Sequence, residues 1–139
     1  MRSKTALALL PILLLLVFAV TARQKVAATT EWAAKPKLAI ESLEHSFGTV
    51  KPGTPLNYTF KIANQGDANL EITKVSPSCG CTTSDFDKVV APGKTGGITL
   101  VIEKTDSYKG EVVKTATVTT NDADHQTFTL TLRANFKAD

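Results

Sequence analysis

Leu56-Asn57-Tyr58-Thr59-Phe60-Lys61-Ile62 is the stretch that most clearly indicates the fold of this 139-residue chain. Large apolar side chains occupy every second position, and polar side chains occupy the positions between them. Successive side chains of a β-strand point to opposite faces of a sheet, whereas an amphipathic helix repeats about every 3.6 residues. The stretch therefore predicts a strand with one face in a hydrophobic core and the other in solvent.

The chain on either side repeats this pattern in short segments separated by Gly, Pro, Asn and Asp. No segment after Pro36 shows a helical period. About seven strands in roughly 100 residues, with a turn about every 8–12 residues, are typical of an immunoglobulin-like sandwich. Alternation with one buried face favours antiparallel pairing. We therefore predict an all-β, immunoglobulin-like antiparallel sandwich over residues 37–139. Its other strands contain Leu38 and Ile40, Phe47 and Val50, Leu70 and Ile72, Ile98 to Ile102, residues 111–120, and Phe128 to Phe136.

The first 22 residues have the anatomy of a secretory signal peptide. Arg2 and Lys4 precede a continuous apolar run of 15 residues, Ala6 to Val20, and Val20-Thr21-Ala22 offers small residues for cleavage. The run is short for a membrane span, which needs about 20 apolar residues. We expect cleavage after Ala22 and a periplasmic or secreted protein. If cleavage fails, the same segment tethers the domain to a membrane.

Charge argues against nucleic acid and anionic membranes as partners. Without Arg2 and Lys4, residues 23–139 carry 14 basic and 13 acidic side chains. A chain so close to neutral lacks the basic footprint that such partners require.

Residues 23–36 show no strand alternation and end in proline, which predicts a linker. Trp32, the only tryptophan of the chain, lies in this linker. Two interpretations remain open: a side chain that is exposed or loosely laid on the domain, or an anchor for a protein partner, because tryptophan is enriched at interface hot spots.

Cys79-Gly80-Cys81 concentrates the reactive chemistry of the chain, since these are its only cysteines. Export favours a disulfide, although bridging across one residue requires the loop to curl, because extended Cα atoms two apart lie about 7 Å from each other. Two thiolates also suit copper(I) or zinc, but further ligands are not close in sequence. The third possibility is a pair of separate thiols. All three interpretations stay open at this stage.

The two histidines lie far from the cysteines in sequence. His45 precedes Phe47-Gly48 and is either a hydrogen-bonded structural residue or a contact for a partner or ligand. His125 follows Asp122 and Asp124 in a polar turn, where solvent exposure is a better explanation than a weak cation site. No nucleophile elbow, phosphate loop or paired carboxylates are present, so we expect no enzyme and no small-molecule substrate.

Four motifs in this order and spacing resemble a bacterial family known as domain of unknown function 1573. They are His45-Ser-Phe-Gly-Thr-Val50, Phe60-Lys-Ile-Ala-Asn-Gln-Gly66, Leu70 to Thr82 with its Ser-Cys-Gly-Cys-Thr core, and Asn121-Asp122. The resemblance covers about Leu38 to Phe136 and departs at Ser46, where the family often has aspartate. It implies an exported immunoglobulin-like sandwich akin to major-sperm-protein and hydin-type modules, which serve as protein-binding platforms.

The expected function is a non-catalytic module that binds or scaffolds another protein of the bacterial cell envelope. The alternative is thiol–disulfide exchange or copper handling through Cys79 and Cys81. Under the first hypothesis no cofactor is needed, and under the second copper is the candidate.

Overall fold

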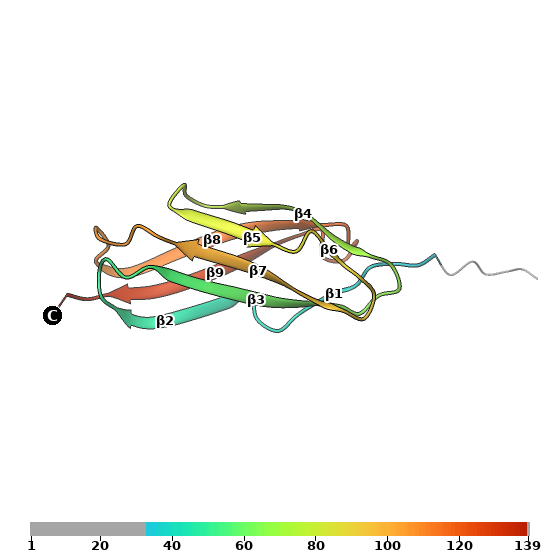
Figure 1. Ribbon diagram of the computed structural model, residues 1–139, viewed down its shortest axis with the longest axis horizontal. Helices are drawn as coiled ribbons and strands as arrows, with labels where there is room; N and C mark the ends of the chain where they lie inside the picture. The colour runs from blue at the N-terminus through green and yellow to red at the C-terminus, as the bar shows by residue number, and fades with distance from the viewer. Residues whose placement is uncertain (1–32, 139) are drawn as a thin grey trace, which may run out of the picture. The chain divides into compact units, whose positions relative to one another are not determined.

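The computed structural model describes residues 33–138, which form two β-sheets packed face to face (Figure 1). The four-stranded sheet has the spatial order β1 (Leu38–Ile40), β3 (Leu56–Asn64), β7 (Thr95–Ile102) and β5 (Thr82–Phe86). The five-stranded sheet has the order β2 (Glu44–Val50), β9 (Thr127–Phe136), β8 (Gly110–Thr120), β4 (Leu70–Pro77) and β6 (Val89–Val90). The all-β, immunoglobulin-like sandwich is confirmed. The predicted signal peptide, Trp32 and most of the predicted linker lie outside the described residues.

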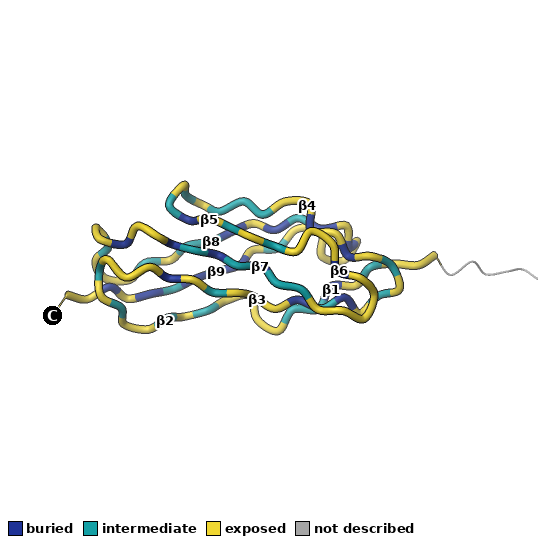
Figure 2. Tube along the Cα trace, viewed as in Figure 1, coloured by how far each residue is buried: buried dark blue, intermediate teal, exposed yellow. Residues whose placement is uncertain are grey.

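The core forms between the two sheets from the alternating apolar positions. Figure 2 shows buried and exposed positions alternating along the strands. Phe60 and Ile62 of β3 are 2% and 1% exposed, so this strand turns the predicted face inward. In the predicted strand from Phe128 to Phe136, the alternate side chains Leu130, Leu132, Ala134 and Phe136 are buried, and Phe128 is half-buried against the core. The buried apolar side chains are Leu38, Leu56, Phe60, Ile62, Leu70, Ile72, Val90, Ile98, Leu100, Ile102, Ala116, Val118, Leu130, Leu132, Ala134 and Phe136.

The N-terminal edge strand is divided between the two sheets. β1 pairs antiparallel with β3 over only three residues, and the chain then crosses to the other sheet, where β2 pairs parallel with β9. The alternation suggested a purely antiparallel sandwich, and the parallel pairing of β2 with β9 corrects this prediction. β2 continues in the direction of β1 after the crossing, and its neighbour in the second sheet, β9, runs in that same direction. Residues 33–138 contain no helix long and apolar enough to cross a membrane.

β5 is a strand that the sequence pattern does not reveal. Its residues Thr-Thr-Ser-Asp-Phe pair with β7 from Thr82↔Ile102 to Phe86↔Ile98. Only Thr82 of this strand is fully buried. A polar strand at a sheet edge buries little side-chain surface, so the apolar alternation that marks the other strands is missing.

The buried side chain of Asn64 joins three segments at the end of β3. Its amide nitrogen donates to the carbonyls of Ala68, at 2.7 Å, and Val90, at 2.9 Å. Its amide oxygen accepts from the backbone N–H of Gly66, at 2.9 Å, and of Lys37, at 3.3 Å. An amide has two donors and two acceptor positions, so Asn64, which is 1% exposed, is fully satisfied.

Gly66 lets the chain before β1 approach this turn. A Cβ at Gly66 would overlap the backbone of Lys35, Pro36 and Lys37. The carbonyl of Lys35 accepts from the backbone N–H of Asp67, at 2.9 Å. The last residues of the predicted linker therefore pack against the sandwich.

Asp122 holds β1 to the turn between β8 and β9. Its carboxylate accepts from the backbone N–H of Leu38, at 2.8 Å, and of Asp124, at 3.0 Å, and contacts His125 Nδ1 at 3.1 Å. The expectation of a solvated turn is wrong for Asp122, which is 3% exposed. Burial raises the pKa of this carboxyl, but the two N–H donors and His125 lower it more, so the net pKa lies below its ordinary value of 3.8.

We expect Phe60→Ala to lower the free energy of unfolding by about 3–5 kcal/mol, because the substitution removes a buried aromatic ring and leaves a cavity. Chemical denaturation followed by circular dichroism measures this. Val113→Ala is the control, since Val113 is 43% exposed and should change stability by about 0.5 kcal/mol or less. Equal losses in the two variants would contradict the assignment of the buried face.

We expect Asp122→Asn to lower the free energy of unfolding by about 1–3 kcal/mol at about pH 7, because it weakens hydrogen bonds to a charged acceptor. A carboxyl with a lowered folded-state pKa stabilises the fold above its ordinary value of 3.8, and that stability is lost as pH falls toward the folded pKa. Urea unfolding at about pH 7 and about pH 3 should therefore show that the free energy of unfolding falls less between these pH values in Asp122→Asn than in the parent. Asp124→Asn is the control, because Asp124 is exposed, and this variant should show the same decrease in unfolding free energy as the parent.

Candidate functional site

The cysteine loop connects β4 of one sheet to β5 of the other, at the end of the sandwich that carries the C-terminus (Figure 1). Pro77 is the last residue of β4, and although proline has no N–H to donate, the pairing with β8 continues past it, because the N–H of Ser78 donates to the carbonyl of Thr115 at 2.8 Å. The N–H of Thr115 in turn donates to Ser78 Oγ at 3.3 Å. Alternate residues of a strand bond to opposite sides, so the missing donor of Pro77 faces the open edge.

Cys79 and Cys81 form a disulfide in this loop. Their Cα atoms are 5.4 Å apart, so the loop is curled, and the N–H of Thr82 donates to the carbonyl of Cys79 at 3.3 Å. Gly80 does not have a positive φ, and a Cβ there would meet nothing within 4 Å. The curl of the loop therefore does not require glycine at this position.

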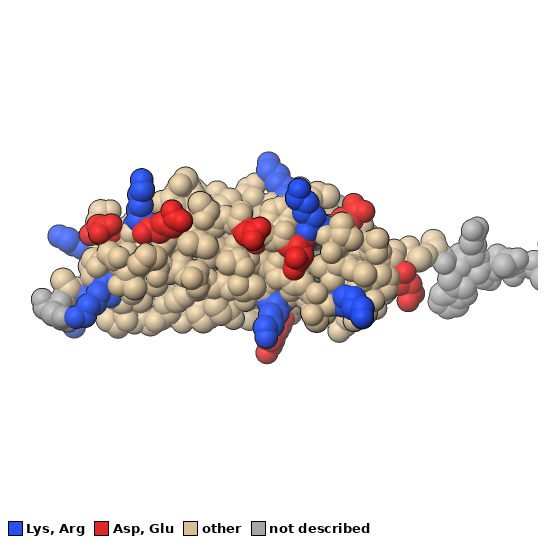
Figure 3. Space-filling model, viewed as in Figure 1, with Lys and Arg blue, Asp and Glu red and all other residues tan. Residues whose placement is uncertain are grey.

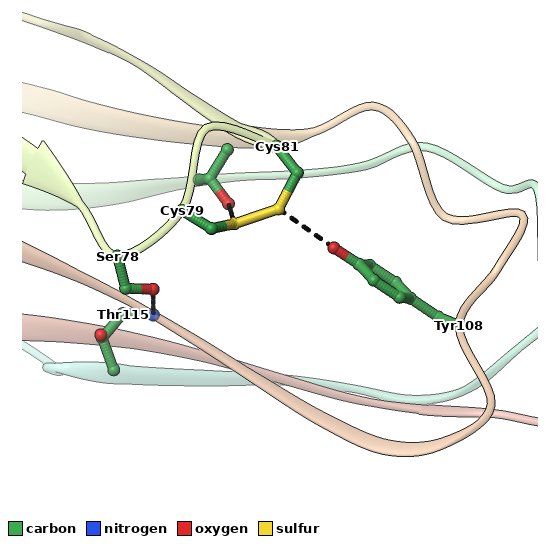
Figure 4. The surroundings of a disulfide bond; sticks show 6 residues. Ser78, Cys79, Cys81, Tyr108 and Thr115 are labelled. Carbon is green, nitrogen blue, oxygen red and sulfur yellow. Dashed lines mark hydrogen bonds between the residues drawn. A yellow bond between two sulfur atoms is a disulfide. The ribbon is translucent and has the colours of Figure 1, made fainter.

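Tyr108 is the residue of this site that the sequence analysis missed. Its hydroxyl donates to Cys81 Sγ at 3.1 Å, whereas Cys79 Sγ lies 3.7 Å from the hydroxyl of Thr82 (Figure 4). The ring of Tyr108 meets Phe136 edge-on at 5.3 Å between centroids, and Lys114 Nζ lies 4.8 Å from the Tyr108 centroid. Tyr108 follows Cys81 by 27 residues and belongs to no periodic segment, so no sequence signal placed it here.

The histidines lie elsewhere in the sandwich. His125 contacts Asp122, and His45 stacks on Tyr58 with 3.6 Å between ring centroids and also meets Phe47 at 4.7 Å. Residues 33–138 contain no group of three or more His, Cys, Asp and Glu side chains arranged to hold a metal ion. Copper binding by the cysteine pair requires two thiolates, so that interpretation applies only to a reduced loop.

A groove of about 470 Å³ lies where β3 is no longer covered by β1. It contains the stacked rings of His45 and Tyr58, one from each sheet. His45, the predicted partner contact, is therefore half-buried in a groove at the sandwich edge, away from the disulfide. The groove is lined by Glu41, Ser42, Glu44, His45, Tyr58, Thr59, Phe60 and Lys61.

The chain belongs to the family described as "Protein of unknown function (DUF1573)", whose model matches residues 38–136. This confirms the resemblance seen in the motifs. No curated protein sequence matches the chain.

Several solved structures have a similar fold at low identity. A protein of unknown function from Porphyromonas gingivalis W83 is 16% identical, with a TM-score of 0.62 over 74% of this chain and 47% of that one. The VesB protease of Vibrio cholerae is 10% identical, with a TM-score of 0.57 over 73% of this chain and 32% of that one. The ASH/PapD-like domain 7 of human CEP192 is 12% identical, with a TM-score of 0.55 over 74% of this chain and 87% of that one. This chain therefore spans less than half of the first two proteins, and the likeness is one of fold.

We expect the double variant Cys79→Ser with Cys81→Ser to lose less than about 2 kcal/mol of unfolding free energy, against about 3 kcal/mol for a disulfide that closes a 15-residue loop. The ring encloses one residue, so it restricts the unfolded chain little. Thermal unfolding of the oxidised parent and the double variant measures the difference. A melting temperature lowered by tens of degrees would show that the loop holds the fold together.

Proposed function

We propose that this chain is an exported, non-catalytic immunoglobulin-like module that binds another protein of the cell envelope at the free edge of β3. The observation that carries the proposal is the short pairing of β1, which covers only Ile62 to Asn64 of the nine-residue β3. No described residue pairs with the outer side of β3 from Leu56 to Lys61. An extended partner segment can continue the line of β1 and pair antiparallel with β3.

The direction of the backbone groups along this edge follows from Asn64. Its N–H donates to the carbonyl of Lys94 at 2.9 Å, and its carbonyl accepts from the N–H of Gly93 at 2.8 Å, so both groups face the β7 side. The register between β3 and β7 has no shift from Leu56 to Ala63. Because backbone direction alternates along a strand, the N–H and C=O groups of Asn57, Thr59 and Lys61 face outward.

The groove beside this edge supplies side-chain contacts for the partner. The stacked rings of His45 and Tyr58 offer an aromatic surface among polar side chains, and Glu41 and Lys61, which also line the groove, carry opposite charges. We therefore propose a partner segment that is extended and carries an apolar or aromatic side chain opposite Tyr58. Lys61 at the edge also discourages pairing between copies of this chain, since a lysine on an edge strand opposes edge-to-edge pairing of two sheets.

The charge distribution supports a protein partner over nucleic acid. On the face that Figure 3 shows, acidic and basic side chains are interspersed, with no continuous basic patch. The similarity of fold to the ASH/PapD-like domain is compatible with a module that is not an enzyme. Export rests on the predicted signal peptide.

A photo-crosslinking residue at Lys61, in the full chain produced by its own bacterium, tests this proposal. We expect it to capture one envelope protein, and the same residue at Asp85, toward the end of the opposite edge strand β5 that is farther from the cysteine loop, to capture none. Asn57→Pro removes an outward-facing donor without breaking the β3–β7 ladder, so it should abolish the crosslink.

Ser84→Pro is the matched control for this variant. The N–H of Asp87 donates to the carbonyl of Gly97 at 3.1 Å, so by alternation the N–H of Ser84 faces outward at the other edge. Ser84→Pro should therefore leave the Lys61 crosslink intact. Capture that is equal at both edges, or that survives Asn57→Pro, would contradict binding at β3, and so would the absence of any crosslink.

A further inference from the structure

The two sulfurs of the disulfide lie in unequal surroundings. Cys81 Sγ accepts a hydrogen bond from the Tyr108 hydroxyl at 3.1 Å, and Figure 4 shows this hydroxyl on the side of Cys81 that faces away from Cys79. Cys79 Sγ has the more distant hydroxyl of Thr82, at 3.7 Å. A negative charge that develops on one sulfur is therefore better stabilised on Cys81.

The Tyr108 hydroxyl is held in place before any reaction. The N–H of Tyr108 donates to the carbonyl of Thr105 at 3.0 Å, and the fully buried Thr105 donates through its hydroxyl to the carbonyl of Thr54 at 2.8 Å. Lys114 lies over the ring face, and its attraction to the ring helps to hold Tyr108 in place. A donor positioned in advance costs no reorganisation when charge forms.

The loop is open to a reactant and contributes little to the fold. Both cysteines are half-buried, Gly80 between them is exposed, and the space next to Gly80 is empty. A ring of one intervening residue adds little stability, so opening it costs the sandwich little. Access and low structural cost are the conditions under which a disulfide exchanges with thiols.

We propose that this loop is a thiol–disulfide exchange site, in which an external thiolate attacks Cys79 and Cys81 departs as the thiolate bound by Tyr108. The attacking sulfur forms a bond to Cys79 Sγ, the Cys79–Cys81 bond breaks, and its electron pair remains on Cys81 Sγ. The hydroxyl of Tyr108 also occupies the approach to Cys81 that lies opposite Cys79, which directs attack to Cys79.

The reaction partner is a dithiol of another exported protein. Its second thiolate attacks the partner sulfur of the mixed disulfide and releases Cys79 as a thiolate. In the balanced reaction the partner gains a disulfide, and the loop takes up two electrons and two protons to become a dithiol. This proposal is independent of the binding edge on β3, since β5 and β1 are the opposite edges of the four-stranded sheet.

Reduced glutathione serves as the probe of this chemistry, and the rate of disulfide loss from the oxidised chain is measured for the parent and for Tyr108→Phe. The phenylalanine keeps the ring and removes only the hydroxyl. We expect the rate to fall about ten-fold, as for the loss of a hydrogen bond to a charged sulfur. Thr82→Val removes the hydroxyl near Cys79, which is not the leaving sulfur, and should change the rate less than about two-fold. An unchanged rate in Tyr108→Phe would overturn the role of Tyr108.

The position of the glutathione adduct tests the direction of attack on the parent itself, so this test does not depend on any variant folding. The reaction is stopped early with acid, the free thiol is alkylated, and fragmentation between Cys79 and Cys81 locates both groups by mass spectrometry. We expect glutathione on Cys79 and the alkyl group on Cys81, with the preference reduced in Tyr108→Phe. Glutathione mainly on Cys81, or equally on both, would overturn the proposal.

Discussion

The buried amide of Asn64 is the interaction on which the arrangement of the two sheets depends most. Its four hydrogen bonds connect the residue before β1, the turn after β3 and the carbonyl of β6. A buried amide that lost one partner would leave a polar group unsatisfied, which costs about 1–3 kcal/mol, so these segments keep one relative position. The backbone of Asn64 is also paired toward β7, in phase with the β3–β7 ladder that leaves the groups of Asn57, Thr59 and Lys61 facing outward. One residue thus determines where β1 begins, on the strand whose outward backbone groups remain free beyond it.

The division of the first strand between the sheets follows from the same anchor and creates the open edge. Asn64 and Asp122 hold the backbone of Lys37 and Leu38, from opposite sheets, so β1 starts at a defined place. The chain leaves β3 after Ile40 and joins β9, and the outer side of β3 beyond Ile62 loses its neighbour. The crossing also brings His45 of β2 onto Tyr58 of β3, so the free edge and the aromatic groove arise together. In an undivided strand, neither feature would exist.

The main strands could be predicted from the sequence because they bury one face, as Phe60 and Ile62 do. β5 could not, because an edge strand of Thr, Ser and Asp carries no apolar alternation. The parallel pairing of β2 could not be predicted either, since alternation shows which face of a strand is buried but not which sheet the strand joins. At the candidate site, the sequence singled out Cys79 and Cys81 through their spacing. Tyr108 and the burial of Asp122 depend on contacts 27 and 84 residues away in the chain, which local patterns do not encode.

The disulfide is placed where a change of its state leaves the core intact. The loop joins β4 of one sheet to β5 of the other along one edge of the sandwich. The buried apolar cluster includes neither cysteine. Opening the ring therefore releases a short connection while β4 stays paired to β8 and β5 to β7. Tyr108 comes from a third segment, the loop before β8, so the hydrogen bond to Cys81 crosses from one connection to another. Because Thr105 fixes that second loop through Thr54, the donor remains in position whether the sulfurs are bonded or separate. A rigid frame with a reactive loop at its end is what reversible exchange requires, since the frame supplies the donor and the loop supplies the movement.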